Sequence, residues 1–390
     1  MLFVHDVKAL LYNDEVYARS YGRNIWERYL RVFDNITLCT RCKQAQVDQI
    51  KGIDKVNGDN VSFDKRIGMF KGPDAFFSKK IRRILRENIK NHEAIIIRLD
   101  SFLGLMAVHE CKKQGKPYLI ECVGCAWDSF WNHGITGKML APFLFLQMKI
   151  AIKNAPFVVY VTKEFLQSRY PTNGQNTNIS NVALPSIEDS LLKNRLEHID
   201  ASEQSIIHLM TIANVGVKYK GFQFVIRALG RIKKEKGHCK YRYHIVGEGD
   251  QSFLYGEAVR ANVIENIVFH GAVSHRVVFE LLRNEVDIYI QPSLQEGLPR
   301  AMIEAMSCGL PCIGTDVAGI PELIQSEFIY KRAENMPKQI ALILEKYNKT
   351  EQRKAARYNF QNSKNYDSEL LTNRRTNFLN KFKVRLDNNL

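Results

Sequence analysis

Short apolar runs alternate, from the start of the chain, with longer segments in which apolar residues recur at helical spacing. This alternation predicts an α/β protein with parallel sheets that are covered by helices on both faces, the doubly wound class. In the first half of the chain, the runs that predict strands are residues 3–6, 35–41, 94–99, 117–123 and 157–162. In the second half they are residues 206–213, 243–246, 266–273 and 286–290.

The length of 390 residues suits two domains of about 180 residues each rather than one core. The first domain ends with the segment Asn-Val-Ala-Leu-Pro, and we place it at residues 1–186. A polar stretch, 187–204, reads as a linker to a second domain at 205–365. The last segment, 366–390, has a helical pattern.

Residues 76–90 predict a basic amphipathic helix. Phe77, Ile81, Ile84, Leu85 and Ile89 share one stripe, and Lys and Arg side chains fill the other face. Such a helix can lie on an anionic membrane leaflet, where each surface cation adds about 1 kcal/mol. The alternative is a domain helix that buries its stripe against the sheet and leaves the basic face in water. Both interpretations stay open here, and residues 378–385 have a similar character.

The stretch 291–311 carries the most informative local pattern. It follows the apolar run 286–290, which predicts a buried strand, and it starts with a loop. Pro299 suits the first turn of a helix, because its missing N–H would have no partner there. Gly309 and Pro311 end this helix, since the glycine supplies a left-handed cap and the proline cannot continue. A loop followed by a helix start offers free N–H groups and a positive dipole end to an anion.

Glu304 is the unusual residue of this helix. It shares a face with two small residues, Ala301 and Cys308, which leave room for something to approach. One interpretation is an intrahelical pair with Arg300, which contributes only a few tenths of a kcal/mol. The other is a carboxylate in a partly desolvated cleft, where a polyol with paired hydroxyls would be a suitable partner. The spacing alone leaves both open.

Glu296 and Glu304 lie in the pattern E-G-L-P-x-x-x-x-E-A, which continues as Gly-Leu-Pro-Cys-Ile-Gly-Thr-Asp-Val-Ala-Gly-Ile-Pro-Glu over residues 309–322. This long stretch resembles the signature of the family 4 retaining glycosyltransferases. The resemblance implies a GT-B fold, in which two Rossmann-like domains face a central cleft and a C-terminal helix crosses back to the first domain. It also implies a nucleoside diphosphate sugar as donor. By resemblance, Glu304 binds the donor ribose, and Glu296 lies at the transferred sugar as a catalytic residue.

The resemblance extends to other loops of the second domain. Lys220, within Lys-Gly, matches a lysine that grips the donor diphosphate, and we assign it a catalytic role on that ground. Relatives carry an arginine five residues before the Lys-Gly pair, where this chain has Val215, so half of the clamp is absent or is supplied by Lys218. The further donor-binding candidates are backbone positions in the loops after the predicted strands: Gly216, Gly247, Gly249, Gly297 and Leu298.

The first domain gives weaker signals. Relatives usually have a glycine pair near the donor phosphates after the first strand, and only Gly22 remains here, so that a plain turn is the alternative. The loop 124–137 follows a predicted strand and belongs at the carboxyl edge of the sheet. Asp128 and His133 in this loop are candidates for contact with the acceptor, and a structural role is the alternative for each.

The formal net charge of +15 indicates an anionic partner: nucleic acid, an acidic membrane leaflet or a phosphorylated ligand. We expect no nucleic acid, because the sequence has no helix-turn-helix, zinc-finger or aromatic ribonucleoprotein motif. The start of the chain shows no signal peptide, and the longest apolar run, 139–146, is far shorter than the roughly 20 residues of a membrane span. We therefore expect a cytoplasmic protein, with a peripheral contact at the inner face of the cell membrane as an open question.

The segments 39–42 and 122–125 are both C-x-x-C, a spacing found in zinc and redox sites. Each ends a predicted strand, and in a doubly wound sheet two other strands would hold them roughly 14 Å apart. That distance is too large for one zinc ion with bonds of about 2.3 Å. We predict buried thiols. The chain also has no D-x-D motif, and we expect no metal and no cofactor beyond the donor substrate.

These patterns and the resemblance predict transfer of a sugar, with retention, from a UDP- or GDP-sugar to a hydroxyl of a glycan or a lipid-linked oligosaccharide. The expected setting is surface polysaccharide biosynthesis: capsule, exopolysaccharide or O-antigen. One alternative is another GT-B enzyme, such as a nucleotide-sugar epimerase or a glycosyltransferase with a small acceptor. The other is a basic, non-enzymatic binder of nucleic acid or acidic glycans. The sequence leaves the sugar, the base, the acceptor, the linkage and the oligomeric state undecided.

Overall fold

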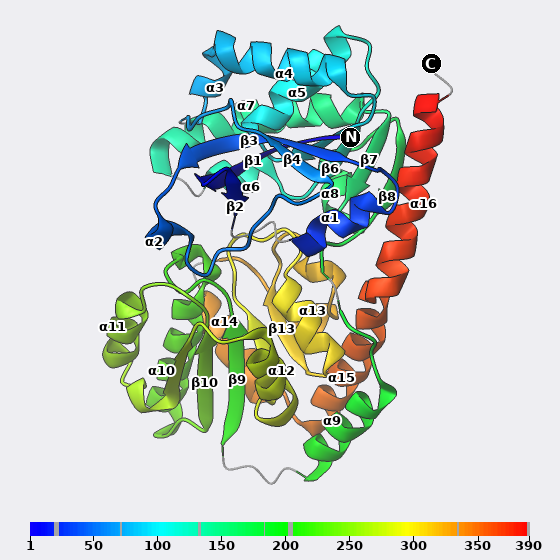
Figure 1. Cartoon of the computed structure of the whole chain (residues 1–390). Coiled ribbons are helices and arrows are strands. Elements are labelled where there is room, and N and C mark those ends of the chain that lie inside the picture. The colour runs from blue at the N-terminus through cyan, green and yellow to red at the C-terminus, as the bar shows by residue number, and fades with distance from the viewer. Residues whose placement is uncertain are drawn as a thin grey trace. The chain divides into compact units, whose positions relative to one another are not determined.

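The computed structural model describes residues 1–18, 23–70, 72–131, 134–182, 184–201, 206–333 and 335–387. The chain divides into two compact units (Figure 1). Unit 1 contains Met1–Ile179 together with Thr372–Leu390, and unit 2 contains Ser180–Leu371. Gly22 and His133 lie outside the described residues.

Unit 1 is built on a sheet in the order β4-β3-β1-β5-β6-β7-β8, in which neighbouring strands are parallel, and β2 pairs antiparallel with β1. Connections leave β1 toward both edges of the sheet, as the doubly wound prediction requires. The strands are β1 (Leu2–Tyr12), β2 (Glu15–Tyr17), β3 (Ile36–Gln44), β4 (Val61–Asp64), β5 (Ile95–Leu99), β6 (Leu119–Cys122), β7 (Phe157–Tyr160) and β8 (Gln175–Asn178). β1 is longer than the predicted 3–6, because its pairing with β3 resumes at Lys8 after a register shift that follows Val4.

The helices of unit 1 are α1 (Arg23–Leu30), α2 (Val47–Ile50), α3 (Asp74–Phe77), α4 (Lys79–Asn91), α5 (Phe102–Lys113), α6 (Ala126–Trp131), α7 (Gly134–Lys153) and α8 (Phe165–Arg169). The last helix of the chain, α16 (Ser368–Asp387), begins in unit 2 and continues in unit 1. In unit 1, its Phe378 and Phe382 rings pack against Phe157, with centroid distances of 5.8 and 5.2 Å.

The helix predicted at 76–90 is interrupted. α3 ends at Phe77, and Ser78 starts α4 by accepting a hydrogen bond from the backbone N–H of Ile81. The apolar residues of α4 are buried in the core: Ile81, Ile84, Leu85 and Ile89. Phe77 is not part of this stripe, since it is 84% exposed. The apolar face of α4 is therefore a domain-helix face, and only its basic face meets water.

α7 differs from the short apolar run that the sequence suggested. Among the described residues it is the helix that is long and apolar enough to cross a membrane by length and composition. A third of its most apolar window, 33%, is buried, and Leu144, Met148 and Ile152 belong to the core of unit 1. Because α7 buries this face in the core of unit 1, it packs against unit 1 as a domain helix.

The cysteines of the two C-x-x-C segments are buried. The first segment lies on β3 and the second follows β6, and β1 and β5 separate these strands, as predicted. Desolvation is the main reason that the pKa of Cys42 rises to about 11, and it also raises the pKa values of Cys39, Cys122 and Cys125. These are features of inert core thiols, which confirms the buried-thiol interpretation.

Unit 2 has a parallel sheet in the order β11-β10-β9-β12-β13-β14. Its strands are β9 (Ile207–Ile212), β10 (Tyr241–Val246), β11 (Ile267–Gly271), β12 (Ile288–Gln291), β13 (Cys312–Thr315) and β14 (Ile329–Tyr330). This order is that of a dinucleotide-binding sheet. The direction of winding reverses between β9 and β12, and ligands of such sheets bind at the carboxyl ends of the strands at this point.

The α-helices of unit 2 are α9 (Asp189–Ala201), α10 (Phe222–Lys236), α11 (Ser252–Arg260), α12 (His275–Asn284), α13 (Arg300–Ser307), α14 (Met336–Lys346) and α15 (Lys349–Ser363). Its short 3-10 helices are η1 (Lys218–Lys220), η2 (Ile264–Asn266), η3 (Ile320–Glu322), η4 (Ser326–Phe328) and η5 (Lys364–Tyr366). The stretch 187–204, expected as a linker, contains α9. The buried Arg195 of α9 donates to the carbonyl oxygens of Leu282 and Val286 in unit 2.

Candidate functional site

The loops that follow β9 and β12 are held together at the switch point of unit 2. Gly221 has a φ of +82°, and a Cβ at this position would lie 1.9 Å from the carbonyl oxygen of Pro292. The backbone N–H of Leu294 also donates to the carbonyl of Tyr219 at 2.7 Å. A side chain at residue 221 would push the loops apart. The glycine of the Lys-Gly pair therefore serves close packing of two backbones.

This packing brings Lys220 and Glu296 together, although the sequence separates them by 76 residues. The Nζ of Lys220 lies 2.6 Å from Oε1 of Glu296. The two side chains are 21% and 10% exposed, so the pair is largely shielded from water. A charge-assisted hydrogen bond of this kind fixes the direction of the ammonium group.

Glu296 is positioned by buried polar side chains of β12 and its loop. Ser293 and Gln291 donate to the same oxygen, Oε1, at 2.7 and 3.0 Å. Gln291 accepts in turn from the hydroxyl of Tyr289 at 2.9 Å, and Thr315 donates to the backbone oxygen of Ser293 at 2.7 Å. Because Lys220, Gln291 and Ser293 all donate to Oε1, the carboxylate has a defined orientation in which Oε2 is directed elsewhere.

α13 follows the predicted pattern. Pro299 is its N-cap, and Gly309, with a φ of +70°, follows its C-terminal end. Gly297 and Leu298, the backbone candidates, lie half-buried directly before the helix. Their position places N–H groups and the positive end of the dipole beside Glu296.

Glu304 lies on the second turn of α13 and its side chain is 18% exposed. Its contact comes from α12: Nε2 of His275 lies 3.3 Å from Oε1 of Glu304. α12 starts here because the hydroxyl of Ser274 caps it by accepting the N–H of Val277. Within the described part of the chain, Glu304 thus pairs with His275 and not with Arg300, and the intrahelical interpretation is wrong.

The loops after β9 and β10 are also packed backbone to backbone. Gly247, at a φ of +146°, would place a Cβ 1.7 Å from the carbonyl of Ala213, and Gly249, at +124°, would place one 2.5 Å from the N–H of Gly216. The N–H of Val215 donates to the carbonyl of Glu248 at 2.9 Å. These glycines shape the edge of the site, and whether they contact a donor stays a prediction.

The structure shows the surroundings of residue 215, where relatives carry the arginine that this chain lacks. Val215 is buried, so no charged group can occupy that place without rearrangement. Lys218 points to a different partner, because its ammonium lies 4.5 Å from the ring centroid of Phe253 on α11. A guanidinium reaches the β12 loop from another strand: Arg332, after β14, donates to the carbonyl of Leu294 at 3.1 Å. Sequence spacing could not have found Arg332, which follows Leu294 by 38 positions.

In unit 1, the described acceptor candidate is Asp128, which lies half-buried on the first turn of α6. The structure adds two carboxylates that we did not select, Asp6 and Asp100. Oδ2 of Asp6 accepts the N–H of Phe102 at 2.7 Å, and Asp100 accepts from the hydroxyl of Ser129. Desolvation raises the pKa of both acids. Asp6 ends the predicted strand 3–6 and Asp100 directly follows the predicted strand 94–99, which was the available signal.

Lys220, Gln291, Ser293 and Glu296 thus form one hydrogen-bonded cluster of unit 2, and Gly297 and Leu298 follow it directly in the chain. Glu304 lies further along, on α13, where it pairs with His275. The cluster contains a shielded ammonium, an oriented carboxylate and a helix N-terminus, which suit a phosphorylated ligand. A second carboxylate, Glu304, lies on the same helix with an imidazole beside it and can accept hydrogen bonds from hydroxyl groups. The sequence does not indicate His275, because its contact with Glu304 joins positions 29 residues apart. Gln291 and Ser293 lie in the same segment as Glu296, 5 and 3 residues before it, but no motif marks them.

Comparison with protein families places most of unit 2 in a known group. The family model described as "Glycosyl transferases group 1" matches residues 207–346. Protein CapJ of Staphylococcus aureus is 36% identical over 336 residues, which are 85% of this chain and 82% of that protein. The amylovoran biosynthesis glycosyltransferase AmsK of Erwinia amylovora is 33% identical over 132 residues, which are 32% of this chain and 31% of that protein.

Solved structures resemble the whole chain. Sucrose-phosphate synthase from Thermosynechococcus elongatus has a TM-score of 0.68 at 14% identity, and the match covers 98% of this chain and 99% of the synthase chain. Anabaena Alr3699/HepE in complex with UDP-glucose has a TM-score of 0.62 at 14% identity, over 97% of this chain and 99% of its own. At these identities the likeness shows the fold alone.

Proposed function

We propose a sugar-transfer reaction for this chain, which belongs to the group 1 glycosyltransferases and has the GT-B fold. The proposed reaction transfers a sugar from a nucleoside diphosphate sugar to a hydroxyl of a glycan or lipid-linked oligosaccharide, with retention. The observation that supports the proposal best is the Lys220–Glu296 pair, 2.6 Å apart, at the start of the helix that carries Glu304. In this proposal one extended donor contacts all three side chains.

The leaving diphosphate is where negative charge grows as the bond to the sugar breaks. Preorganised donors are most effective at such a place, and the candidates are the ammonium of Lys220 and the N–H groups of Gly297 and Leu298. Glu296 holds Lys220 in position through one oxygen and presents the other to the transferred sugar. Glu304 accepts from the ribose hydroxyls. In this proposal the lysine and the helix N-terminus take the place of a divalent metal.

The proposed step balances without an enzyme nucleophile. The bond between the anomeric carbon and the diphosphate oxygen breaks, and the acceptor oxygen bonds to the same face of the anomeric carbon. The proton of the acceptor hydroxyl passes to an oxygen of the departing diphosphate. The products are the glycosylated acceptor and a nucleoside diphosphate.

The biological setting is proposed from the relatives. AmsK is an amylovoran biosynthesis glycosyltransferase by name, and we propose that this chain likewise builds a bacterial surface polysaccharide at the cytoplasmic side of the membrane. UDP-glucose is the ligand in the HepE structure, so we propose a UDP-sugar as the first donor to test.

The test is a thermal-shift screen of UDP- and GDP-sugars with the wild type and Glu304→Gln. A ligand at about 100 times its Kd stabilises by about 2.7 kcal/mol, so the correct nucleotide will raise Tm in the wild type, and Glu304→Gln will reduce the shift. Release of nucleoside diphosphate only after addition of an acceptor separates transfer from epimerisation. The proposal fails if neither nucleotide class stabilises the wild type, or if the variant responds equally.

A further inference from the structure

α7 of unit 1 exposes a long apolar stripe. Ile135, Met139, Phe143, Leu146 and Ile150 recur at helical spacing, and each is between 46% and 81% exposed. The opposite face of α7 is in the core, so the helix is apolar on both sides. Single exposed apolar residues are normal in proteins, but a contiguous stripe of this length indicates an interaction surface.

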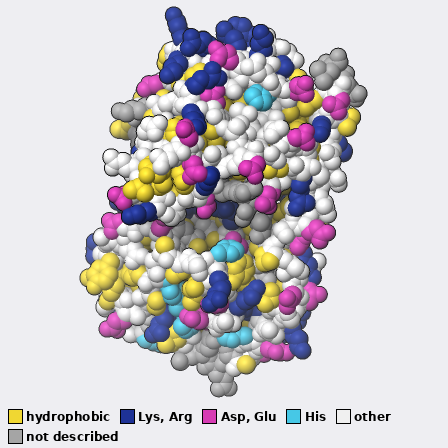
Figure 2. Space-filling model, viewed as in Figure 1, with side chains coloured by type: hydrophobic (Ala, Val, Ile, Leu, Met, Phe, Trp, Pro, Cys, Tyr) yellow, Lys and Arg dark blue, Asp and Glu magenta, His cyan; other side chains and the backbone are white. Residues whose placement is uncertain are grey.

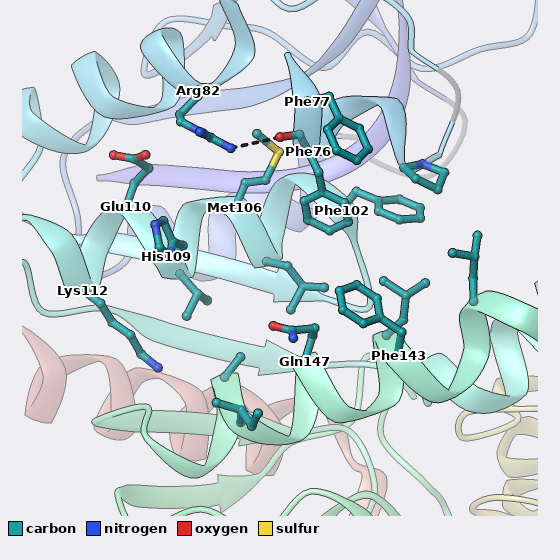
Figure 3. Close-up of a pocket in the computed structure, with 17 residues that line it drawn as sticks. Phe76, Phe77, Arg82, Phe102, Met106, His109, Glu110, Lys112, Phe143 and Gln147 are labelled. Carbon is teal, nitrogen blue, oxygen red and sulfur yellow. Dashed lines mark hydrogen bonds between the residues drawn. The ribbon is translucent and has the colours of Figure 1, made fainter. Parts of the chain in front are cut away.

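The stripe borders an apolar groove of about 620 Å³ between α3, α5 and α7 (Figure 3). Phe143 and Ile150 line it from α7, and Phe102 and Met106 line it from α5. Phe77, 84% exposed at the end of α3, stands at its edge and extends the apolar surface.

The groove also joins the stripe to the basic face of α4. Arg82 of α4 lines the groove, where it donates to the carbonyl of Phe76 at 2.9 Å (Figure 3). The other cations of α4 are exposed: Lys79, Lys80, Arg83, Arg86 and Lys90. Arg83 and Arg86 are paired with Glu87 and Glu110, so the three lysines supply most of the uncompensated charge. Figure 2 shows Lys and Arg side chains gathered at the top of the view, over α4. A large apolar surface thus lies beside a concentrated positive charge.

α7 itself has the composition of an interfacial helix. Its sequence contains no Asp or Glu, and Lys138 and Lys149 are exposed along one edge of the apolar stripe. Lysines at such an edge can extend their charged ends toward phosphates while their stems cover apolar surface. Protein–protein interfaces are, by contrast, depleted in lysine.

We propose that α7 and the basic face of α4 form a surface that docks on an anionic lipid bilayer. The stripe of α7 lies at the boundary of headgroups and acyl chains, Phe77 enters beside it, and Lys79, Lys80 and Lys90 of α4 contact lipid phosphates. The membrane contact expected from α4 alone is thereby reassigned, because the apolar residues of α4 are buried and those of α7 are free to insert. α7 lies on the leaflet and does not span it, since its other face belongs to the core.

The experiment is co-sedimentation of the full chain with vesicles of phosphatidylcholine alone, or of phosphatidylcholine mixed with phosphatidylglycerol, at low and high salt. No donor or acceptor is added, so the result does not depend on the proposed reaction. Met139→Glu/Leu146→Glu alters the stripe, and Tyr255→Glu/Val259→Glu on α11, also exposed, is its matched control. Lys79→Glu/Lys80→Glu alters the basic face, and Lys234→Glu/Lys346→Glu in unit 2 is its control.

We expect binding to the mixed vesicles that weakens at high salt, and at least about a tenfold loss in each test variant but not in its control. Unchanged Tm values will show that the variants fold, because all the substituted side chains are exposed. Failure of the wild type to bind mixed vesicles better than phosphatidylcholine overturns the proposal, and so does equal binding by Met139→Glu/Leu146→Glu. A wild-type dimer that this variant converts to monomer, in sedimentation velocity, would assign the stripe to a second copy of the chain instead.

Discussion

Lys220 of η1 and Glu296 of the β12 loop form an ion pair in which Nζ and Oε1 are 2.6 Å apart. The pair exists because the loops after β9 and β12 touch through backbone atoms at Gly221 and Pro292. Glu296 fixes the direction of the Lys220 ammonium at the carboxyl ends of strands β9 and β12. In the proposed reaction, this direction is what makes the ammonium a preorganised partner for the leaving diphosphate.

Lys220→Met is expected to lower kcat by about 10²–10³-fold, because it removes one preorganised donor from the developing charge. Steady-state kinetics with the donor identified by thermal shift will measure the change. Lys218→Met is the matched control. Lys218 lies on the same short helix and contacts the ring of Phe253, so its loss should have a much smaller effect. Equal losses would mean that Lys218 supplies the second cation of the clamp.

Gly221→Ala tests the contact between the two loops. The added Cβ would lie 1.9 Å from the carbonyl of Pro292 at a φ of +82°, so we expect a loss of about 2–4 kcal/mol in unfolding free energy and weaker donor binding. Gly237→Ala has a similar φ of +78° and no atom within 4 Å of its Cβ, and it should cost only about 1 kcal/mol. Denaturant unfolding will give both values, and their difference isolates the collision from backbone strain.

The sequence was sufficient where the relevant interactions are local. The strand before residue 291, the cap at Gly309 and the alternation that predicts the doubly wound sheet depend on neighbouring residues, and the structure confirms them. The family signature then singled out Glu296, in the loop before α13, and Glu304, on α13. Whether these residues bind a donor as predicted awaits the experiments above.

Contacts between distant segments could not be predicted. Glu304 has His275 of α12 as its partner, 29 residues away, and not the local Arg300. The helix predicted at 76–90 breaks at Ser78, because a serine hydroxyl can cap a new helix start as easily as it can sit on a helix surface. Its apolar stripe could have faced lipid or core equally well. Only the packing on the sheet decides which.

Three histidines on adjacent strands of unit 2 predict a loss of stability in acid. Nε2 of His244 lies 2.8 Å from His208, and its Nδ1 lies 2.9 Å from His270. Burial lowers the pKa of His244 from 6.5 to about 4, and the neighbouring histidines and Arg242 add to the effect, while Asp287 opposes it. The folded state thus favours the neutral ring. The stabilisation is present above pH 6.5 and is lost as the pH falls toward 4.

We expect the unfolding free energy to drop by about 1–2 kcal/mol over this range, less than the full shift would give, because partial solvent access screens the charge. His244→Gln should be less stable than the wild type at neutral pH and less sensitive to acid. Urea unfolding at a series of pH values will show this as two curves that converge toward pH 4. Parallel curves would exclude His244 as the titrating group.

The contacts of the last helix, α16, predict that the stability of unit 1 depends on residues near the end of the chain. Arg375 of α16 is buried and its Nη1 lies 3.3 Å from Oε1 of Glu121 on β6, which also pairs with Arg98 at 2.9 Å. Desolvation alone would raise the pKa of Glu121, but Arg98 and Arg375, with smaller contributions from the Tyr29 hydroxyl and Arg28, hold the pKa below its ordinary value of 4.5. This depressed pKa contributes stability above pH 4.5 that disappears as the pH falls further.

Arg375→Met removes one of the two arginines and leaves a buried carboxylate with less compensation, so we expect a loss of about 3 kcal/mol at neutral pH. The loss should shrink in acid, where Glu121 becomes protonated and no longer needs the cation. Arg231→Met is the control, since Arg231 pairs with Glu235 on the exposed face of α10 at 2.6 Å, and such a pair contributes about 0.3–0.5 kcal/mol. Thermal unfolding of both variants at neutral and acid pH provides the comparison. Equal effects of the two substitutions would show that the Arg375–Glu121 pair stabilises unit 1 no more than an exposed ion pair does.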